Sequence, residues 1–308
     1  MGKYNISKEF DPLINFKPPI NKFLLGIFQK IMKPPRKLFK SEKVSVETRK
    51  IAGYNRDKIK VLIISPNNIK NDAPCLVYFH GGGFVFEAAK YHYQYACEYA
   101  IGTGCKIVFV KYRLGPKYKF PYPLEDCYCA YDWTVKNSKS LNINKNKIIL
   151  GGDSAGGTLA ASVCLLARDR NMSVMPAGQM LIYPFLDATL SSQSNKKFTD
   201  TPMWNSKMSK KISDMCFPDK TVKGGEYVSP VTFRNLRNLP EAYIETAEFD
   251  SLKDDGLNYA KRLARAKNNV ELYETVGTIH GYDMITNVPT TRKSVEKRIA
   301  FLNRIFSK

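Results

Sequence analysis

The sequence predicts an α/β fold built on a mostly parallel sheet with helices on both faces. From about residue 44 onward, short apolar runs alternate with stretches of helical periodicity, which is the pattern of strand–helix units in a parallel sheet. Several of these runs are continuously apolar, as expected for strands that are buried on both faces. With 308 residues, the chain is long enough to bury about three quarters of its unfolded surface.

Eight segments have the apolar character of strands, so we expect an eight-stranded sheet. The first two follow each other too closely for a crossover helix, and we therefore expect them to form an antiparallel hairpin at the edge. The segments are VSVETRKIA (44–52), KIKVLIIS (58–65), PCLVYFH (74–80), CKIVFVKY (105–112), NKIIL (146–150), GQMLIYPF (178–185), EAYIETAEF (241–249) and NVELYETV (269–276).

Helical patterns fill the gaps between these segments, and two of them have a clear apolar face. One is residues 256–268 and the other is the final segment after Pro289. Apolar residues three and four positions apart fall on one side of a helix. The faces are Leu257, Ala260, Leu263 and Ala264 in the first helix, and Val295, Ile299, Leu302 and Phe306 in the second.

Two stretches interrupt the alternation, and we expect both to contribute to a helical cap over one end of the sheet. Residues 188–238 separate two strands and are too long for a plain loop. Residues 1–43 precede the first strand and include a predicted amphipathic helix. The α/β core is accordingly expected in residues 44–187 and 239–308. The apolar residues of the N-terminal helix are Ile20, Phe23, Leu24, Ile27, Phe28 and Ile31.

The chain is strongly basic, and half of its excess charge lies near the N-terminus. Lys and Arg number 48 against 28 Asp and Glu, a formal net charge of +20, and residues 1–60 hold 15 of the cations and 5 of the acids. Such an arm can contact an anionic membrane or a nucleic acid. Because no nucleic-acid-binding motif accompanies the charge, we expect no nucleic-acid partner and at most a weak contact with anionic membranes.

The cysteines and the apolar runs indicate a cytoplasmic protein. Seven cysteines without a CxxC pair lie mostly inside apolar runs, as buried thiols do in a reducing compartment. No run reaches the length of a membrane span, and the N-terminal apolar run lacks the cleavage site of a signal peptide. Folding needs neither a disulfide nor a structural metal, and no cofactor is expected. The oligomeric state stays open, a homodimer included.

The stretch LGGDSAGGTLA (150–160) places a serine at a predicted strand-to-helix turn. Gly152 and Gly156 flank Ser154 at two positions on either side. Their missing side chains let neighbouring backbones approach closely while the serine adopts a strained conformation. This G-x-S-x-G pattern is typical of a nucleophile elbow, which exposes the hydroxyl at the carboxyl edge of the sheet.

A serine hydroxyl becomes a nucleophile when a base removes its proton, and this chain has three histidines, His80, His92 and His280. In proteins with this turn, the acid and the histidine follow the serine along the chain, so His280 is the candidate base. Asp250, at the end of EAYIETAEFD, is the preferred acid that would orient the imidazole. Asp187, at the end of LIYPFLD, is the alternative.

The glycine run in YFHGGGF supplies the remaining groups that acyl transfer needs. It follows the predicted strand CLVYF, and Gly81, Gly82 and Gly83 let bare backbone amides turn toward a negatively charged oxygen. The amide of Ala155 adds a donor at the N-terminus of the next helix, where the helix dipole also favours an anion. A glycine run can instead cradle a phosphate, but neither GK[ST] nor a G-x-G-x-x-G helix opening follows it.

Four motifs in this order and spacing, HGGGF, GDSAGG, EFDSLKDDG and IHGYD, resemble the hormone-sensitive-lipase-like branch of the α/β-hydrolase esterases. The resemblance begins near Cys75, runs to the C-terminus and includes KYRLGPKYKFPYPLEDC and LIYPFLD. It implies an α/β-hydrolase fold in which Ser154 is the nucleophile, Asp250 the acid and His280 the base.

The same resemblance implies that Gly82, Gly83 and Ala155 are the oxyanion donors and that His80 shapes the glycine loop. The chain departs from the family after the acid, where Ser251, Lys253 and Asp255 stand in place of Pro, Arg and Glu. The acid itself is kept, so the departure concerns the rigidity of that loop.

The expected activity is hydrolysis of small carboxylic esters with short to medium acyl chains through a serine acyl-enzyme. Phe23, Phe28 and Trp204 would line an acyl pocket or pack in the core. The same triad would support a deacetylase, amidase or thioesterase activity. The family resemblance also includes ligand-binding proteins that have lost a triad member; because all three members are present here, an enzyme is preferred.

Overall fold

The computed structural model describes residues 3–18, 20, 25, 27, 29, 41–217 and 225–308. These residues contain one eight-stranded sheet with the strand order β1-β2-β4-β3-β5-β6-β7-β8, so the predicted fold class is confirmed. The strands are β1 (Val44–Ala52), β2 (Lys58–Pro66), β3 (Ala73–Phe79), β4 (Lys106–Lys111), β5 (Ile143–Asp153), β6 (Gly178–Ile182), β7 (Glu241–Phe249) and β8 (Val270–Ile279).

In the spatial order of the sheet, the strands from β4 through β3, β5, β6 and β7 to β8 are parallel, and β2, next to the edge strand β1, is reversed. β1 and β2 form the predicted antiparallel hairpin, and β2 also runs antiparallel to its other neighbour, β4. All later pairings are parallel. The carboxyl ends of β3, β5, β7 and β8 therefore meet at the same edge of the sheet, which is where ligands bind in sheets of this kind.

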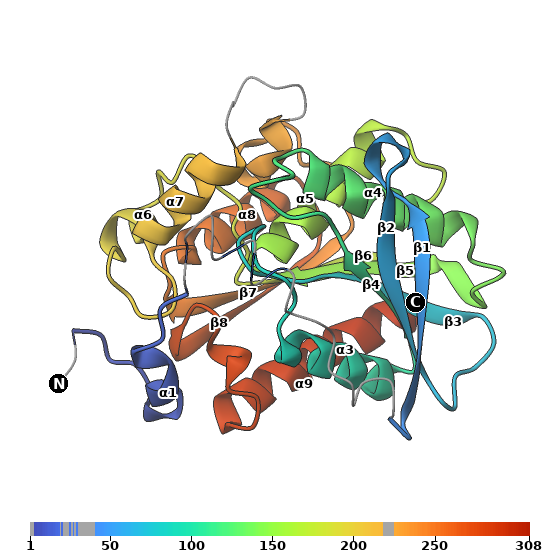
Figure 1. Ribbon diagram of the computed structural model, residues 1–308, viewed down its shortest axis with the longest axis horizontal. Coiled ribbons are helices and arrows are strands. Elements are labelled where there is room, and N and C mark those ends of the chain that lie inside the picture. The colour runs from blue at the N-terminus through green and yellow to red at the C-terminus, as the bar shows by residue number, and fades with distance from the viewer. Residues whose placement is uncertain are drawn as a thin grey trace.

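Helices cover both faces of the sheet (Figure 1): α3 (Lys90–Thr103) and α9 (Pro289–Phe306) lie on one face, while α4 (Tyr122–Lys136), α5 (Ala155–Asp169) and α8 (Lys253–Arg265) lie on the other. Alternate strand residues point into two apolar cores. In β3, Val77 packs in the core with α4 and α5, and its neighbours Leu76 and Tyr78 pack in the core with α3 and α9. None of the helices in the described ranges is long and apolar enough to cross a bilayer.

The predicted apolar face of the helix around residues 256–268 was partly wrong. Leu257 is half-buried and Ala264 is exposed, whereas the residues of α8 that pack on the sheet include Gly256, Tyr259 and Leu263. The helix is turned so that the Tyr259 ring, which buries far more surface than an alanine methyl, faces the core. In α9 the predicted face is largely confirmed, but a charged residue, Arg298, is also fully buried on it.

Residues 188–238 form an excursion between β6 and β7 and contain α6 (Gln193–Lys197), α7 (Ser206–Cys216) and the 3₁₀ turns η4 (Gly225–Val228) and η5 (Pro230–Thr232). Each of the two α-helices has an N-cap side chain that accepts a backbone amide: Ser192 accepts that of Asn195, and Asn205 accepts that of Met208. In Figure 1, α6 and α7 lie beside α8 at the end of the sheet that β7 and β8 form.

The N-terminal segment 3–18 contains η1 (Lys8–Phe10) and α1 (Asp11–Ile14) and contacts both β8 and the 188–238 excursion. The Ser7 amide donates to the Gly277 carbonyl across 2.8 Å, and Lys3 Nζ pairs with Asp200 at 2.7 Å. Of the predicted amphipathic helix, Phe23, Leu24, Phe28 and Ile31 lie outside the described residues.

Candidate active site

Ser154 stands at the turn between β5 and α5 with φ 53° and ψ −118°, a left-handed region that non-glycine residues rarely adopt. The flanking glycines make the turn sterically feasible. A Cβ atom on Gly152 would lie 2.4 Å from the carbonyl oxygen of Phe79, and one on Gly156 would lie 2.0 Å from the same oxygen. Both distances are far inside van der Waals contact with the backbone of the central strand β3, so neither position accepts a side chain.

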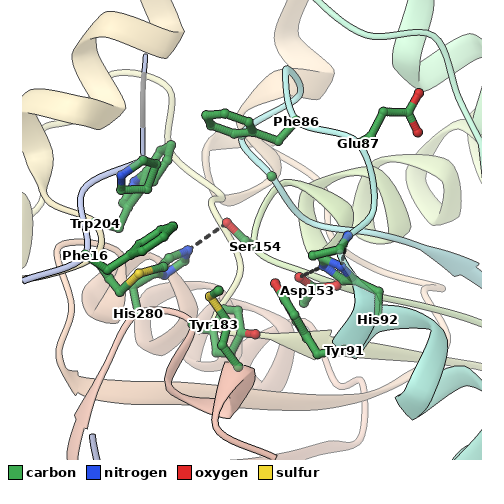
Figure 2. A pocket seen from close by; sticks show the side chains of 17 residues that line it. Phe16, Phe86, Glu87, Tyr91, His92, Asp153, Ser154, Tyr183, Trp204 and His280 are labelled. Atoms are coloured by element: carbon green, nitrogen blue, oxygen red, sulfur yellow. Dashed lines mark hydrogen bonds and ion pairs between the residues drawn. The ribbon is translucent and has the colours of Figure 1, made fainter. Parts of the chain in front are cut away.

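Three residues that the sequence singled out separately lie in one hydrogen-bonded row. His280 Nε2 is 2.9 Å from Ser154 Oγ (Figure 2), and His280 Nδ1 is 2.7 Å from Asp250 Oδ2. The carboxylate is fully buried, and its other oxygen accepts the Leu252 amide at 2.9 Å. With its proton on Nδ1 and donated to Asp250, the imidazole presents an unprotonated Nε2 to the serine hydroxyl.

Asp187, the alternative acid, lies away from His280. Its carboxylate accepts hydrogen bonds from the amide and hydroxyl of Thr189 and from the Ser191 hydroxyl, so it closes a turn at the start of the 188–238 excursion. Asp255 packs beside it and accepts the amides of Leu186 and Asp187, both across 3.2 Å. Burial, together with the nearby Asp187 charge, raises the pKa of Asp255 well above its ordinary value.

The loop after Asp250, where the chain departs from the resembled family, is held by the 188–238 excursion. The carbonyl of Ser251 accepts hydrogen bonds from Ser194 Oγ at 2.8 Å and from Asn195 Nδ2 at 3.0 Å. Ser251 itself is fully buried. Contacts from α6 therefore fix the segment that follows the acid.

The glycine loop leaves the end of β3 and faces the same cavity as Ser154. Gly82 has φ 112° and Gly83 has φ 58°, both in the region that favours glycine. The carbonyl of Gly82 accepts the amides of Val85 and Phe86, which holds the loop in a tight turn. Within the described part of the chain, no group accepts the amides of Gly82 or Gly83. Ala155, the first residue of α5, has an amide that the helix itself leaves unpaired.

Asp153, immediately before Ser154, ties the glycine loop to the serine turn. Its Oδ1 accepts the Gly81 amide at 3.0 Å and the Tyr78 hydroxyl at 2.7 Å. Its Oδ2 accepts His92 Nε2 at 3.0 Å, and His92 Nδ1 accepts the Ala89 amide at 2.9 Å. The loop from residue 81 to residue 89 is thus fastened at both ends to one carboxylate.

The same contacts decide the charge of Asp153. Burial by itself would raise the pKa of this carboxyl, but the hydrogen bonds from His92 and Tyr78 lower the pKa overall. Asp153 is therefore a buried carboxylate with three donors around it. Its position inside the GDSAGG motif, between Gly152 and Ser154, was the one available signal for this role.

His80 is fully buried under the glycine loop, outside the cavity lining. Its ring stacks on Tyr112 with the centroids 4.6 Å apart, and Nδ1 is 2.7 Å from the Gly81 carbonyl, to which it donates. Its Nε2 has no hydrogen-bond partner among the described residues. Burial lowers the pKa of His80 to about 3, so the ring is neutral at ordinary pH.

A cavity of about 220 Å³ opens over Ser154. In Figure 2, Phe16 and Trp204 lie on the side of His280, and Tyr91, His92 and Glu87 lie on the opposite side of the serine. Phe16 comes from the N-terminal segment and Trp204 from the 188–238 excursion, so both segments contribute to the lining. Phe23 and Phe28, the other predicted lining residues, lie outside the described part of the chain.

A second, much smaller cavity of about 10 Å³ adjoins Ser154 and Ala155. Its walls include Phe185, Trp204, Ile212 and Leu252, and His280 is absent from its lining. A space of this size holds about one water molecule or one methyl group. Ser154 therefore faces a roomy cavity on the side of the histidine and a tight one beside the start of α5.

Comparison with known proteins agrees with this geometry. The model of a family described as having the alpha/beta hydrolase fold matches residues 76–284. The chain is 31% identical over 264 residues to Carboxylesterase NlhH of Mycobacterium tuberculosis, covering 84% of this chain and 82% of that protein. It is 30% identical over 251 residues to an arylesterase of Saccharolobus solfataricus, with 81% and 80% covered. A solved esterase from the fungus Rhizomucor miehei superposes with a TM-score of 0.86 at 29% identity, covering 99% and 98% of the two chains.

Proposed function

This chain belongs to the α/β-hydrolase family, and on that basis we propose that it hydrolyses small carboxylic esters through an acyl-enzyme on Ser154. The observation that carries the proposal is the single imidazole of His280, within hydrogen-bond distance of both the Ser154 hydroxyl and the Asp250 carboxylate. The relatives named as esterases support the reaction class. The unpaired amides of Gly82 and Gly83 beside the same hydroxyl support acyl transfer.

In the proposed mechanism, Ser154 Oγ attacks the ester carbonyl carbon as its proton passes to His280 Nε2. Asp250 holds the imidazole and stabilises the imidazolium that forms. The negative oxygen of the tetrahedral intermediate accepts hydrogen bonds from Gly82, Gly83 and Ala155. His280 then returns the proton to the departing alkoxide, which leaves as the alcohol. Water, deprotonated by the same nitrogen, attacks the acyl-enzyme, and the acid is released as the serine regains its proton.

The two cavities suggest where the parts of the ester lie. The leaving oxygen must be near His280 Nε2 to receive its proton, and His280 lines the cavity of about 220 Å³. We therefore assign this cavity to the alcohol part. The cavity of about 10 Å³ beside Ala155 then receives the acyl group. Its size favours the short end of the short-to-medium range, with the acetyl group preferred.

We further propose that the N-terminal segment and residues 188–238 together form the cap over the core of residues 44–187 and 239–308. Phe16 and Pro18 from the first segment and Met203 and Trp204 from the second line the large cavity. Tyr4 packs edge-on against Phe198 with the ring centroids 5.7 Å apart, which joins the two segments directly. With a substrate in the cavity, this cover would keep bulk water from the serine, which would strengthen the electrostatic interactions of the site.

A series of p-nitrophenyl esters from acetate to decanoate tests the proposed function. The wild-type protein is expected to hydrolyse the shortest esters fastest, and Ser154→Ala is expected to lower kcat by about 10⁴-fold or more. Asp132→Asn, on the exposed face of α4, serves as a surface control. A wild-type protein without activity on any of these esters, or a Ser154→Ala variant with undiminished activity, contradicts the proposal.

Location and assembly are part of the same proposal. All seven cysteines lie in the described part of the chain and are free, which supports a reducing compartment such as the cytoplasm. Exposed Leu272 and Val276 on the edge strand β8 support a homodimer, which light scattering tests. A weak contact of the basic segment 1–43 with anionic membranes is tested by liposome flotation of the full chain and of a chain without these residues.

A further inference from the structure

The large cavity over Ser154 is mainly apolar, and its few polar side chains are nearly all engaged with the protein itself. Glu87 pairs with Lys111 at 2.9 Å. The Tyr183 hydroxyl donates to Asp283 at 2.6 Å, and Trp204 Nε1 donates to Ser209 Oγ at 2.9 Å. The contacts of Asp153, His92, Ser154 and His280 with one another and with the loop have been described above. Each of these groups therefore already has at least one hydrogen-bond or ion-pair partner within the protein.

Tyr91 is the exception. It is the second residue of α3 and lines the cavity, and its hydroxyl has no hydrogen-bond partner among the described residues. Figure 2 shows the hydroxyl directed into the space beside Ser154 and Asp153, on the side of the serine opposite Trp204. Among the described residues that line the cavity, this phenol is the side-chain donor that has no partner within the protein and remains available to a bound molecule.

The Tyr91 ring is held in place by its neighbours. It stacks on the His92 ring with the centroids 3.9 Å apart and an interplanar angle of 29°, and it meets the Tyr95 ring edge-on at 6.2 Å. His92 is itself fixed by Asp153 and the Ala89 amide. The hydroxyl is thus pre-organised, so a hydrogen bond to it costs little conformational entropy.

The chemistry of this hydroxyl is that of a neutral donor. Burial, together with the nearby Asp153 charge, raises the pKa of Tyr91 well above its ordinary value. A substrate that fills the cavity with hydrocarbon would displace water from the hydroxyl and leave it unpaired, which is costly. A substrate with an oxygen atom at this place would replace the water. Sites with a fixed hydrogen-bonding group discriminate strongly against analogues that lack the matching group.

We propose that Tyr91 Oη binds a second oxygen function of the substrate, in the alcohol part close to the scissile ester, so that the natural substrates are esters of oxygenated alcohols, such as acylated polyols. This inference rests on the proposed esterase function and specifies its substrate class. The apolar wall with Phe16 and Trp204 accepts the hydrocarbon part of the same molecule, while Tyr91 selects the polar part. Tyr91 is a specificity-determining residue and takes no part in the proton transfers.

Two matched ester pairs test the proposal, each exchanging a hydroxyl for a methyl group of similar size. The first pair is 2-hydroxyethyl acetate and propyl acetate, which probes the alcohol part. The second is methyl 3-hydroxybutyrate and methyl 3-methylbutyrate, which probes the acyl part and serves as the control, since Tyr91 lines only the cavity assigned to the alcohol part. For the wild type, kcat/KM is expected to favour the hydroxylated member of the first pair by about fivefold to tenfold. The ratio is then measured in Tyr91→Phe and in Tyr93→Phe. Tyr93 lies on the same helix but is absent from the cavity lining.

The expected result is that the ratio falls to about twofold or less in Tyr91→Phe and keeps its wild-type value in Tyr93→Phe. A wild type that does not favour 2-hydroxyethyl acetate over propyl acetate, or that discriminates only in the second pair, overturns the proposal without any variant. A ratio that persists in Tyr91→Phe, or one that falls equally in both variants, also overturns it. In each of these cases the wild type still hydrolyses esters. A wild type that hydrolyses none of the four compounds contradicts the esterase function instead, which keeps the two failures distinct.

Discussion

Asp153 accepts the backbone amide of Gly81 across 3.0 Å. The residue before Ser154, the proposed nucleophile, thus holds the first glycine of the neighbouring loop. The serine turn and the glycine loop come from different strands, β5 and β3, which are adjacent in the sheet. Because the same carboxylate also holds His92, the amides of Gly82 and Gly83 are fixed relative to Ser154 before a substrate arrives. Such pre-organisation is what makes oxyanion donors effective.

Asp153→Asn tests this coupling. The amide nitrogen of the new side chain would face the donor His92 Nε2–H, so one of the two fastenings of the loop is lost while the side chain keeps its size. We expect kcat for p-nitrophenyl acetate to fall by about 10- to 100-fold while KM changes by less than about threefold, since the amides act mainly in the transition state. Asp132→Asn, which removes an exposed carboxylate paired with Lys136, is the control. An unchanged kcat in Asp153→Asn would contradict the coupling.

The choice between the two candidate acids leads to a second prediction. Asp250→Asn should lower kcat by roughly 10⁴-fold, because an asparagine no longer holds the imidazole in the tautomer that accepts the serine proton. The kcat of Asp187→Asn should stay within about fivefold of the wild-type value, since Asp187 contacts Thr189 and Ser191 and lies away from His280. Steady-state kinetics of both variants, with folding checked by circular dichroism, decide the matter. The reverse order of the two effects would make Asp187 the acid.

The small cavity beside Ala155 leads to a third prediction, on chain-length preference. Ile212 of α7 closes one side of this cavity, and Ile212→Ala would add the volume of about three methyl-sized groups. We expect the preferred acyl chain in the p-nitrophenyl series to lengthen by about two carbons, at a cost of about 2 to 4 kcal/mol in the free energy of unfolding. Met284→Ala, which enlarges the other cavity, is the comparison. If Met284→Ala lengthens the preferred acyl chain and Ile212→Ala does not, the two cavities have the opposite roles.

His80 leads to a fourth prediction, on pH and stability. Its pKa is about 3 in the folded protein against 6.5 ordinarily, so between these values the unfolded chain binds one more proton than the folded one. The free energy of unfolding therefore decreases by about 1.4 kcal/mol for each pH unit by which the solution is acidified below 6.5. Between pH 7 and pH 5 the wild type should lose about 2 kcal/mol more than His80→Asn, whose amide can still donate to the Gly81 carbonyl. Urea unfolding at both pH values measures this, and parallel losses would refute it.

The strand pattern could be predicted almost completely because the central strands are buried on both faces. The run around Val77, for example, is continuously apolar and lacks the alternating polar residues of a strand with one exposed face. All eight strands lie where the apolar runs predicted them. The orientation of α8 could not be predicted. The apolar spacing of Leu257 and Ala264 indicates that the segment is helical, but it does not determine which side of the helix packs on the sheet. Which face is buried depends on where the bulky Tyr259 ring finds space against the sheet.

Charged groups in the interior were the main feature that the sequence concealed. Arg298 falls on the apolar face of α9, where a lone arginine suggests an exposed edge of the helix. In the structure it is fully buried between Glu245 and Asp283, at 2.6 and 2.9 Å. These acids come from β7 and from the loop after His280, so the pairing exists only once the sheet has formed. Such a buried network is strongly destabilised when one partner is removed.

The sequence predicts those residues of the candidate site that lie beside glycines or that chain order singles out. Glycines mark Ser154 and the loop at Gly82, and chain order leaves His280 as the candidate base. Asp153, His92 and Tyr91 carry no such marks. Their importance lies in distances between β3, β5 and α3, which no pattern within one segment records.

The most direct test of the central claim is covalent labelling with a fluorophosphonate probe, followed by peptide mass spectrometry. Ser154, activated by His280, is predicted to be modified stoichiometrically in the folded wild type. Labelling should disappear in Ser154→Ala and slow by at least about 100-fold in His280→Asn. A folded wild type that remains unlabelled, or that is labelled at a residue other than Ser154, would contradict the account.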